Sequence, residues 1–522
     1  MRQAAALPFA ENPITKTIND IMTHTIGRAP IINKPYCVPP SPDVMAILFM
    51  EYRHSGKRKK MSFKQFLVSI GFTDPAADTL GMDDAARFRR GPAGPQLIEI
   101  PSHPVTGNLQ VKVLLVDFPD RQGSVPPQHY ADMLFSSGIY PTGSMRDFYK
   151  EISLGKVDVN GSVHGWLRMP KPYSYYTNNQ SGLKAASYPH NAQRMAEDAV
   201  SAALQQGIQF GADLDKLNQG IVTALFIIHA GRGAEQMHPS IAGREIWSHK
   251  WNLRNPIDVG NGLSATIYLT VPNDCKVGVC AHELGHLAFQ WQDFYDPNYG
   301  EDGKEWDGSG VWDLMAGGSW NGDGARPAHP AGLHKLQHRW VSVTTVTKSR
   351  KLTLKPYTAK TGRVYKIVSP QYSSKQYLIL ENRKKRGFDF NLPGEGLLVW
   401  RVDERGEMEA PNAPGLLLVQ ADGKHDLEKP KDWNEGDAGD PFPGQSGQTM
   451  LKATGSISTT FPKGKQSGVS LENIAVDPTN GNITLNVKFA AANPAPPTRG
   501  LTTLPRSRKA GPHWDKAPAR RK

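Results

Sequence analysis

Apolar residues near the start of the chain recur at helical spacing. In SPDVMAILFMEYRHSG, residues 41–56, they follow Ser41, a candidate N-cap, and Pro42, which suits the first position of a helix. A second helix is predicted in SFKQFLVSIGF, residues 62–72, ahead of an irregular linker rich in Gly and Pro. Residues 31–100 are therefore predicted to form a small helical leader.

The next part of the chain alternates between strand and helix patterns. VKVLLVDF, residues 111–118, and IVTALFII, residues 221–228, are apolar runs typical of buried strands. Between them, one helix is predicted to begin at Ser144, which is spaced from Asp147 as in a capping box, and another covers 191–207. This order predicts an α/β (α+β) fold for residues 101–345.

From about residue 345 the pattern changes to short runs of β-branched and aromatic residues. Gly, Pro and Asn separate these runs, which favours an all-β, sandwich-like domain over residues 346–490. The runs are KLTLKPY, VYKIVS, QYLILEN, GLLVWRV, GLLLVQA, VSLENIAV and NITLNVKF.

The helical stretch that begins at Val279 contains the pattern HELGH. On a helix, His282 and His286 lie one turn apart on the same face, so both imidazoles can bind one metal ion. Glu283 stands beside them as a candidate general base for a metal-activated water. An ordinary amphipathic helix is the alternative, and the surrounding sequence has to decide between the two.

Two neighbouring segments favour a metal site. An acidic, aromatic turn directly after the helix offers Asp293 and Asp296, either of which could be a third ligand. Further on, WDLMAGGSWNG, residues 312–322, is a Gly-rich turn around Met315 that could form the floor of such a site.

HELGHLAFQWQDFYD, WDLMAGGSWNG and PAHPAGLHKLQHRWV together resemble the immune inhibitor A family of secreted zinc metallopeptidases. The resemblance extends over residues 37–489 and implies a metzincin-like catalytic domain, with Asp in place of the usual third His. Further segments that carry it are 109–120, 140–161, 225–235, 246–251 and 377–404.

The chain departs from the metzincin pattern at the third ligand. Phe289 stands where metzincins have Gly, and the first Asp comes one place later than the usual ligand. Asp293 is the preferred third ligand and Asp296 the alternative. Glu301 and Glu305 are less suitable, because the glycines around them argue against a helix there.

These features predict a zinc-dependent endopeptidase acting on proteins or peptides by direct attack of water. Zn²⁺ would be held by the two histidines and an aspartate, and Tyr295 is a candidate to donate a hydrogen bond to the oxyanion, with aromatic packing as its alternative role. The competing functions are a catalytically inactive binding protein of the same fold and another HExxH hydrolase such as a deformylase.

The three cysteines suggest two roles. Cys275 and Cys280 flank the start of the helix and could form a disulfide, or remain buried thiols. Cys37 lies in the Pro-flanked PYCVPPSPDV of the leader, which resembles a propeptide-like segment of the family. Its thiolate could replace the catalytic water and keep the enzyme latent, whereas a plain helical extension is the alternative for the leader.

Composition and charge exclude several other classes. The 522 residues have a formal net charge of +12, but eight basic residues and one acidic residue lie in the Pro- and Ala-rich tail 491–522, which is predicted to be disordered. No nucleic-acid recognition motif accompanies the charge, and no apolar run is long enough for a membrane span. The protein is expected to be a monomer.

Location and a second cation are less well defined. Residues 1–30 are predicted to be unstructured and contain no recognisable secretory signal, yet the family resemblance favours an extracellular location. The acidic stretch 434–444 offers Glu435, Asp437 and Asp440 for Ca²⁺, but a solvated turn is the preferred interpretation.

Overall fold

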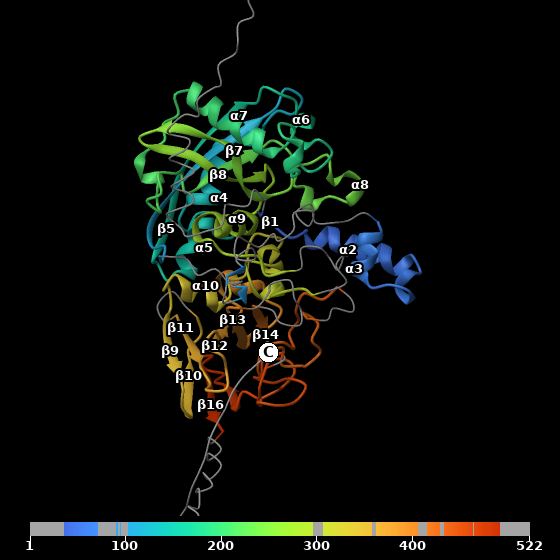
Figure 1. The fold of residues 1–522 in the computed structure, drawn as a ribbon, viewed down its shortest axis with the longest axis vertical. Helices are drawn as coiled ribbons and strands as arrows, with labels where there is room; N and C mark the ends of the chain where they lie inside the picture. Colours follow the sequence, from blue (N-terminus) through green and yellow to red (C-terminus); the bar gives the residue numbers. More distant parts are fainter. Residues whose placement is uncertain are drawn as a thin grey trace, which may run out of the picture. The chain divides into compact units, whose positions relative to one another are not determined.

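The computed structural model describes residues 36–70, 90–91, 94–95, 103–295, 306–357, 362–405, 415–428, 433–462 and 464–490 (Figure 1). The predictions for residues 1–30, for the tail 491–522 and for Asp296, Glu301 and Glu305 lie outside these residues. None of the described helices is long and apolar enough to cross a membrane.

The leader contains the two helices that its pattern predicted. Helix α2 spans Pro42–His54, and the Ser41 hydroxyl accepts a hydrogen bond from the Val44 N–H, as expected of an N-cap. Helix α3 spans Phe63–Ser69 and begins with a capping box formed by Ser62 and Gln65. Both helices bury their aromatic faces against each other.

A six-stranded mixed sheet forms the framework of the catalytic region, with strand order β1-β7-β8-β6-β4-β5. The pairings from β8 through β6 and β4 to the edge strand β5 are parallel, while β7 runs antiparallel to β8, and β1 runs antiparallel to β7. The strands are β1 (Tyr36–Cys37), β4 (Gly107–Asp117), β5 (Val157–Arg168), β6 (Leu225–His229), β7 (His249–Gly260) and β8 (Leu263–Pro272). Strands β4 and β6 confirm the predicted buried strands, whereas β5 and the β7–β8 hairpin were not predicted.

Alternation along the sheet divides the core into two layers. In β4, Val113 and Leu115 face the core shared with helices α5 and α9, whereas Leu114 and Val116 face the core shared with α7 and the leader. The helices of this region are α4 (Pro127–Phe135), α5 (Met145–Ile152), α6 (Tyr173–Thr177), α7 (Ala192–Gln205), α8 (Pro239–Ala242), α9 (Val277–Phe289) and α10 (Gly332–Gln337). The predicted Ser144 and Asp147 capping box of α5 is confirmed.

The C-terminal region consists of two sheets, of orders β14-β13-β12-β11-β9 and β10-β16-β15. All seven predicted runs contain a strand, and β9 was not predicted. The strands are β9 (Ser342–Val346), β10 (Arg350–Leu354), β11 (Arg363–Ile367), β12 (Gln376–Arg383), β13 (Gly396–Asp403), β14 (Leu416–Leu418), β15 (Val469–Val476) and β16 (Ile483–Phe489). A two-stranded pair, β2 (Arg90–Gly91) with β3 (Gly94–Pro95), lies in the leader.

The five-stranded sheet joins the two regions. Leu378 and Leu380 of β12 face a core shared with the three-stranded sheet, whereas Tyr377 and Ile379 of the same strand belong to the core that contains α9. Contacts therefore group the chain up to Phe489 into one compact unit. The domain boundary expected near residue 345 stays a prediction, because apolar packing is continuous across it.

A buried ion network lies where these regions meet. The guanidinium of Arg383, at the end of β12, is fully buried and donates two hydrogen bonds of 2.6 Å to the carboxylate of Asp389. It also donates to Glu381 at 3.3 Å and to the main-chain carbonyls of Trp312 and His329. The guanidinium holds the pKa of Asp389 well below its ordinary value, even though burial alone would raise it. The network therefore ties the C-terminal sheet to the segments that follow α9.

Replacing Arg383 by Met should destabilise the protein strongly, because the Asp389 carboxylate would remain buried without its guanidinium partner. The expected loss in the free energy of unfolding is about 3–5 kcal/mol, measured by urea denaturation. Arg405→Met is the matched control. Arg405 pairs with Asp403 at 3.2 Å but is 51% exposed, so its removal should cost less than about 1 kcal/mol. Equal losses in both variants would contradict this account of the network.

Candidate metal centre

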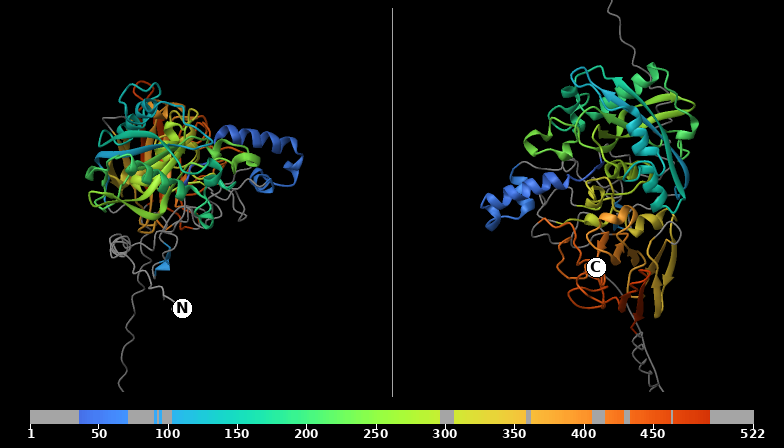
Figure 2. Two further views of the ribbon diagram at one scale, coloured as in Figure 1. Left: turned by 90° about the horizontal axis from the view of Figure 1, so that it is seen from above. Right: turned by 180° about the vertical axis from the view of Figure 1, so that it is seen from behind.

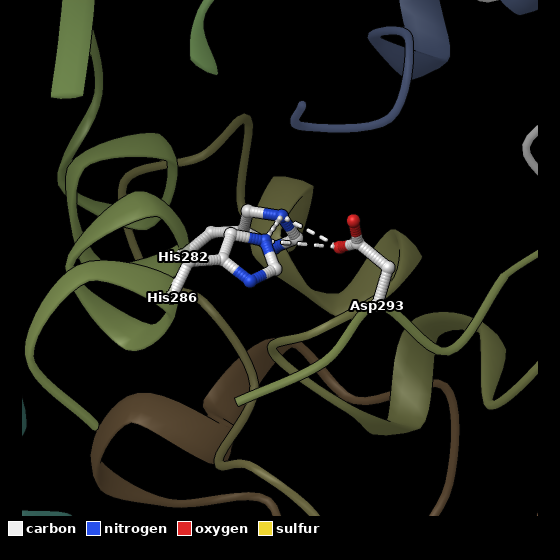
Figure 3. A group of neighbouring side chains, drawn as sticks. All are labelled: His282, His286 and Asp293. Carbon is white, nitrogen blue, oxygen red and sulfur yellow. Dashed lines mark hydrogen bonds and ion pairs between the residues drawn. The ribbon is translucent and has the colours of Figure 1, made fainter. Parts of the chain in front are cut away.

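Helix α9 (Val277–Phe289) carries the HELGH pattern, and every one of its residues is buried. It ends at Gln290, which adopts a left-handed conformation (φ 59°) and turns the chain back toward the helix. Because residues i and i+4 share one face, the side chains of His282 and His286 point to the same place. The turn then brings Asp293 to that place from the other side (Figure 3).

Three ligand atoms meet there. The Nε2 atoms of His282 and His286 are 3.1 Å apart, and they lie 3.2 Å and 3.1 Å from Oδ1 of Asp293. Among the described residues, these three side chains form the more deeply buried of two groups that could hold a metal ion. The structure thus brings together the two predicted histidines and the preferred aspartate.

Main-chain carbonyls fix the orientation of both imidazoles. Nδ1 of His282 donates to the carbonyl of Leu314 at 2.9 Å, and Nδ1 of His286 donates to the carbonyl of Trp291 at 2.7 Å. A neutral imidazole that donates from Nδ1 has its lone pair on Nε2. Both Nε2 atoms are therefore acceptors that point at the centre.

The ionisation of the group suits a cation. Burial lowers the pKa of His286 in spite of the nearby Asp293 carboxylate, which favours the neutral imidazole. The pKa of Asp293 is also lowered, since the two histidines outweigh the effect of its burial. Both carboxylate oxygens of Asp293 lack a hydrogen-bond donor. Three acceptors that face one another without a proton between them fit a metal ion with two nitrogen ligands and one oxygen ligand.

Glu283 stands next to this group and is fully buried. Neither of its carboxylate oxygens has a hydrogen-bond partner. Burial, followed by the negative charges of Asp293 and Glu235, holds its pKa well above the ordinary value. An unpaired carboxyl group beside a potential metal site is the arrangement expected of a general base.

The Gly-rich turn around Met315 supports the site from below, as predicted. Its Leu314 carbonyl orients His282, and its Met315 carbonyl accepts from the N–H of Phe294, next to Asp293. A Cβ added at Gly285, the glycine of HELGH, would lie 2.9 Å from both the Met315 sulfur and the Trp291 ring. Glycine is therefore required for α9 to pack this closely on the turn.

The other predicted residues have different outcomes. The Tyr295 hydroxyl donates to the Cys37 carbonyl at 2.6 Å, so it reaches the leader above the site. The Cys37 thiol is not part of the His282–His286–Asp293 group. Of the two alternatives for Cys275 and Cys280, the structure has buried thiols packed in the core and not a disulfide. Their closeness and burial raise the pKa of Cys275 well above its ordinary value.

The second group of acidic residues consists of Asp422, Asp437 and Asp440. The predicted Glu435 does not belong to it; its carboxylate accepts from the Trp433 indole instead. Lys424 lies 2.8 Å from both Asp422 and Asp437, and Trp312 donates to Asp440 at 2.9 Å. A lysine ammonium thus provides positive charge in this turn, and the preferred interpretation of 434–444 as a solvated turn stays a prediction.

Sequence reasoning did not identify Trp247 and Trp320 as residues of this region. Their indole N–H groups donate to the Val38 and Pro39 carbonyls at 2.9 and 2.7 Å. Both lie inside segments that carried the family resemblance, 246–251 and 312–322. In a sequence, a tryptophan indicates core packing. Only the structure shows which acceptor its indole N–H contacts.

A mixed sheet with an HExxH helix, two oriented histidines and an unpaired glutamate is the arrangement of the metallopeptidase class. Residues 110–345 match the family described as "Immune inhibitor A peptidase M6, catalytic domain". This part of the chain is therefore similar to the catalytic domain of the immune inhibitor A metallopeptidases.

Two relatives with names in that class are similar to this chain. The pre-pro-metalloprotease PrtV of Vibrio cholerae serotype O1 is 29% identical over 258 residues, which is 41% of this chain and 27% of that protein. Immune inhibitor A of Bacillus thuringiensis subsp. alesti is 28% identical over 225 residues, which is 37% of this chain and 32% of that protein. The match thus spans less than a third of PrtV and about a third of immune inhibitor A.

Replacing Gly285 by Ala has two opposing effects on the free energy of unfolding. Helix propensity alone would stabilise the variant by about 1 kcal/mol. The close contacts with Met315 and Trp291 should outweigh that gain and lower the free energy of unfolding by about 1–3 kcal/mol, because overpacking forces neighbours to move. Denaturant unfolding of the metal-free protein measures the sign. A more stable variant would show that the helix does not depend on this contact.

Proposed function

We propose that this protein is a zinc-dependent endopeptidase that hydrolyses peptide bonds in proteins or peptides by direct attack of water. The observation that carries the proposal is the meeting of three acceptor atoms within 3.2 Å of one another, with the unpaired carboxyl group of Glu283 beside them. The family of the catalytic region supports the same chemistry.

His282, His286 and Asp293 would hold the metal. Two imidazoles and one carboxylate are a ligand set that zinc uses in catalytic sites, and three protein ligands leave a position for water or substrate. When bound, zinc lowers the pKa of that water and polarises the carbonyl of the peptide bond. The Leu314 and Trp291 carbonyls keep both imidazoles in the tautomer that this role requires.

The other roles fall to residues of the same cleft. The carboxylate of Glu283 accepts a proton from the attacking water and passes it to the amine that leaves. The Tyr295 hydroxyl donates to the oxygen of the carbonyl under attack, where negative charge develops. Its 2.6 Å hydrogen bond to a main-chain carbonyl of the leader supports this assignment. Neither step requires an acyl-enzyme.

The finer architecture belongs to the same proposal. We infer a metzincin-like catalytic domain over residues 101–345, a sandwich-like domain over 346–490, and a leader that covers the cleft until it is removed or displaced. The protein would act outside the cell as a monomer. Cys37 remains a predicted latency ligand, although its main chain, not its thiol, makes the contacts described above.

Glu283→Gln should retain zinc and lose activity by about 10²–10⁴-fold, because an amide cannot accept the proton of the attacking water. Casein cleavage with and without a chelator measures activity, and elemental analysis measures zinc. Wild type that binds zinc and cleaves no protein would instead indicate an inactive binding protein of this fold. Cleavage by the Gln variant at the wild-type rate would refute Glu283 as the base.

Asp293→Ala should weaken zinc binding by more than about 100-fold, since losing a ligand costs more affinity than losing a group that only orients one. Asp296→Ala is the control and should retain about one zinc per chain. Titration of the metal-free variants with zinc compares the two affinities. If Asp296→Ala alone loses the metal, the third ligand is Asp296.

A further inference from the structure

An extended stretch near the start of the leader lies beside the segments that carry the candidate metal centre. Its strand β1 pairs antiparallel with β7, Tyr36 opposite Lys250 and Cys37 opposite His249, so that β7 would be the edge of the sheet without it. The Val38 N–H continues this pairing by donating to the Ser248 carbonyl at 3.4 Å. The leader is the blue chain in the upper part of Figure 3.

Three consecutive carbonyls of this segment each accept a hydrogen bond from a buried side chain. Tyr295 donates to Cys37 at 2.6 Å, Trp247 donates to Val38 at 2.9 Å and Trp320 donates to Pro39 at 2.7 Å. Trp247 lies just before β7, Tyr295 follows α9, and Trp320 belongs to the turn that contains Met315. Donors from three separate segments thus converge on one stretch of main chain.

These contacts do not depend on the side chains of the leader. Every peptide has carbonyl groups at this spacing, and an exposed strand edge such as β7 can pair with any extended chain. The three donors are 1–7% exposed with the leader in place. If the leader moves away, the three donors lose their carbonyl acceptors. The carbonyl groups of another extended peptide can then accept the same hydrogen bonds.

The same segment is aligned with the groups assigned to catalysis. The Cys37 carbonyl accepts from the Tyr295 hydroxyl, and β1 contacts helix α9, which carries Glu283. The Cys37 carbonyl therefore lies against the hydroxyl that is assigned to the oxygen of the carbonyl under attack. A substrate would need the same placement.

We propose that Trp247, Tyr295 and Trp320 form a main-chain cradle that positions an extended polypeptide substrate antiparallel to β7, and that residues 37–39 occupy the cradle in its place. The proposal rests on the proposed peptidase function. It adds Trp247 and Trp320 as substrate-binding residues, and the ligand class is any unfolded polypeptide, held by its carbonyl groups.

The first test needs no metal and no catalysis. Hydrogen–deuterium exchange of the zinc-free full-length chain reports on the amides of Cys37 and Val38. In Trp247→Phe and Trp320→Phe, each of which loses only an indole donor, these amides should exchange about fivefold faster, the effect of one lost hydrogen bond. Trp340→Phe is the matched control, because it also loses an indole bond to a carbonyl, that of Val105 at 2.9 Å.

A Cys37→Ser variant separates the main chain from the thiol. It retains the carbonyl that Tyr295 binds, so its exchange should equal that of wild type. If Cys37→Ser speeds exchange while both Trp variants leave it unchanged, the thiol holds the leader and the cradle is refuted. The melting temperatures of the Trp247, Trp320 and Trp340 variants should agree, and either cradle variant alone is sufficient for the comparison.

The second test concerns substrate. Val38→Asp in the full-length chain places a carboxylate at a fully buried position of the leader and should displace the leader, because a buried charge without a partner is costly. In this background, adding Trp247→Phe or Trp320→Phe should raise KM for an unfolded protein about fivefold and leave kcat and zinc content little changed. Adding Trp340→Phe should change neither constant.

The outcomes distinguish the two proposals. If Val38→Asp binds zinc but shows no chelator-sensitive cleavage, the peptidase function fails, and the role of the cradle in substrate binding fails with it. If it is active and the Trp247 and Trp320 additions leave KM unchanged, the function stands and the cradle serves only the leader.

Discussion

Three lone pairs that face one another inside the protein are the constraint on which the site depends. The Nε2 atoms of His282 and His286 and a carboxylate oxygen of Asp293 lie 3.1–3.2 Å apart in a buried place with no donor among them. Burying three acceptors together without a donor raises the free energy of the folded protein unless a cation binds between them. The carbonyls of Leu314 and Trp291 hold the imidazoles in this orientation. The fold therefore keeps the three acceptors in place for a metal ion.

The surroundings of the site are rigid for identifiable reasons. Helix α9 can approach the turn around Met315 only because residue 285 is glycine. The buried carboxylate of Asp313 holds that turn in place, because it accepts hydrogen bonds from the N–H groups of Met315 and Ala331. Arg383 of the C-terminal sheet donates to the adjacent Trp312 carbonyl. The C-terminal sheets therefore help to position the metal centre, although none of their residues belongs to it.

The leader contacts Trp247, Tyr295 and Trp320 through its main-chain carbonyls. Pro39 and Pro40 have no N–H, so in this stretch the leader offers the cleft mainly carbonyl oxygens, and the cleft supplies hydroxyl and indole donors to them. Burial of these donors beneath the leader also explains why a segment with only two residues of strand pairing can lie across the site.

The sequence by itself determined the features that depend on local geometry. The i, i+4 spacing placed His282 and His286 on one face. Ser41, Ser62 and Ser144 begin helices, and short runs of β-branched and aromatic residues predicted the C-terminal strands. Such features follow from the backbone within one turn or one strand, and a resemblance to a known family added the chemistry.

Only the tertiary structure decided which distant groups meet. The β7–β8 hairpin was missed because its long strands carry mixed polar and apolar residues, and their pairing is set by neighbours in the sheet. Asp293 reaches the histidines through the left-handed Gln290, and Trp247 and Trp320 meet the leader across more than 200 residues of chain. Contacts of this range depend on packing of the whole unit, and no local pattern in the sequence encodes them.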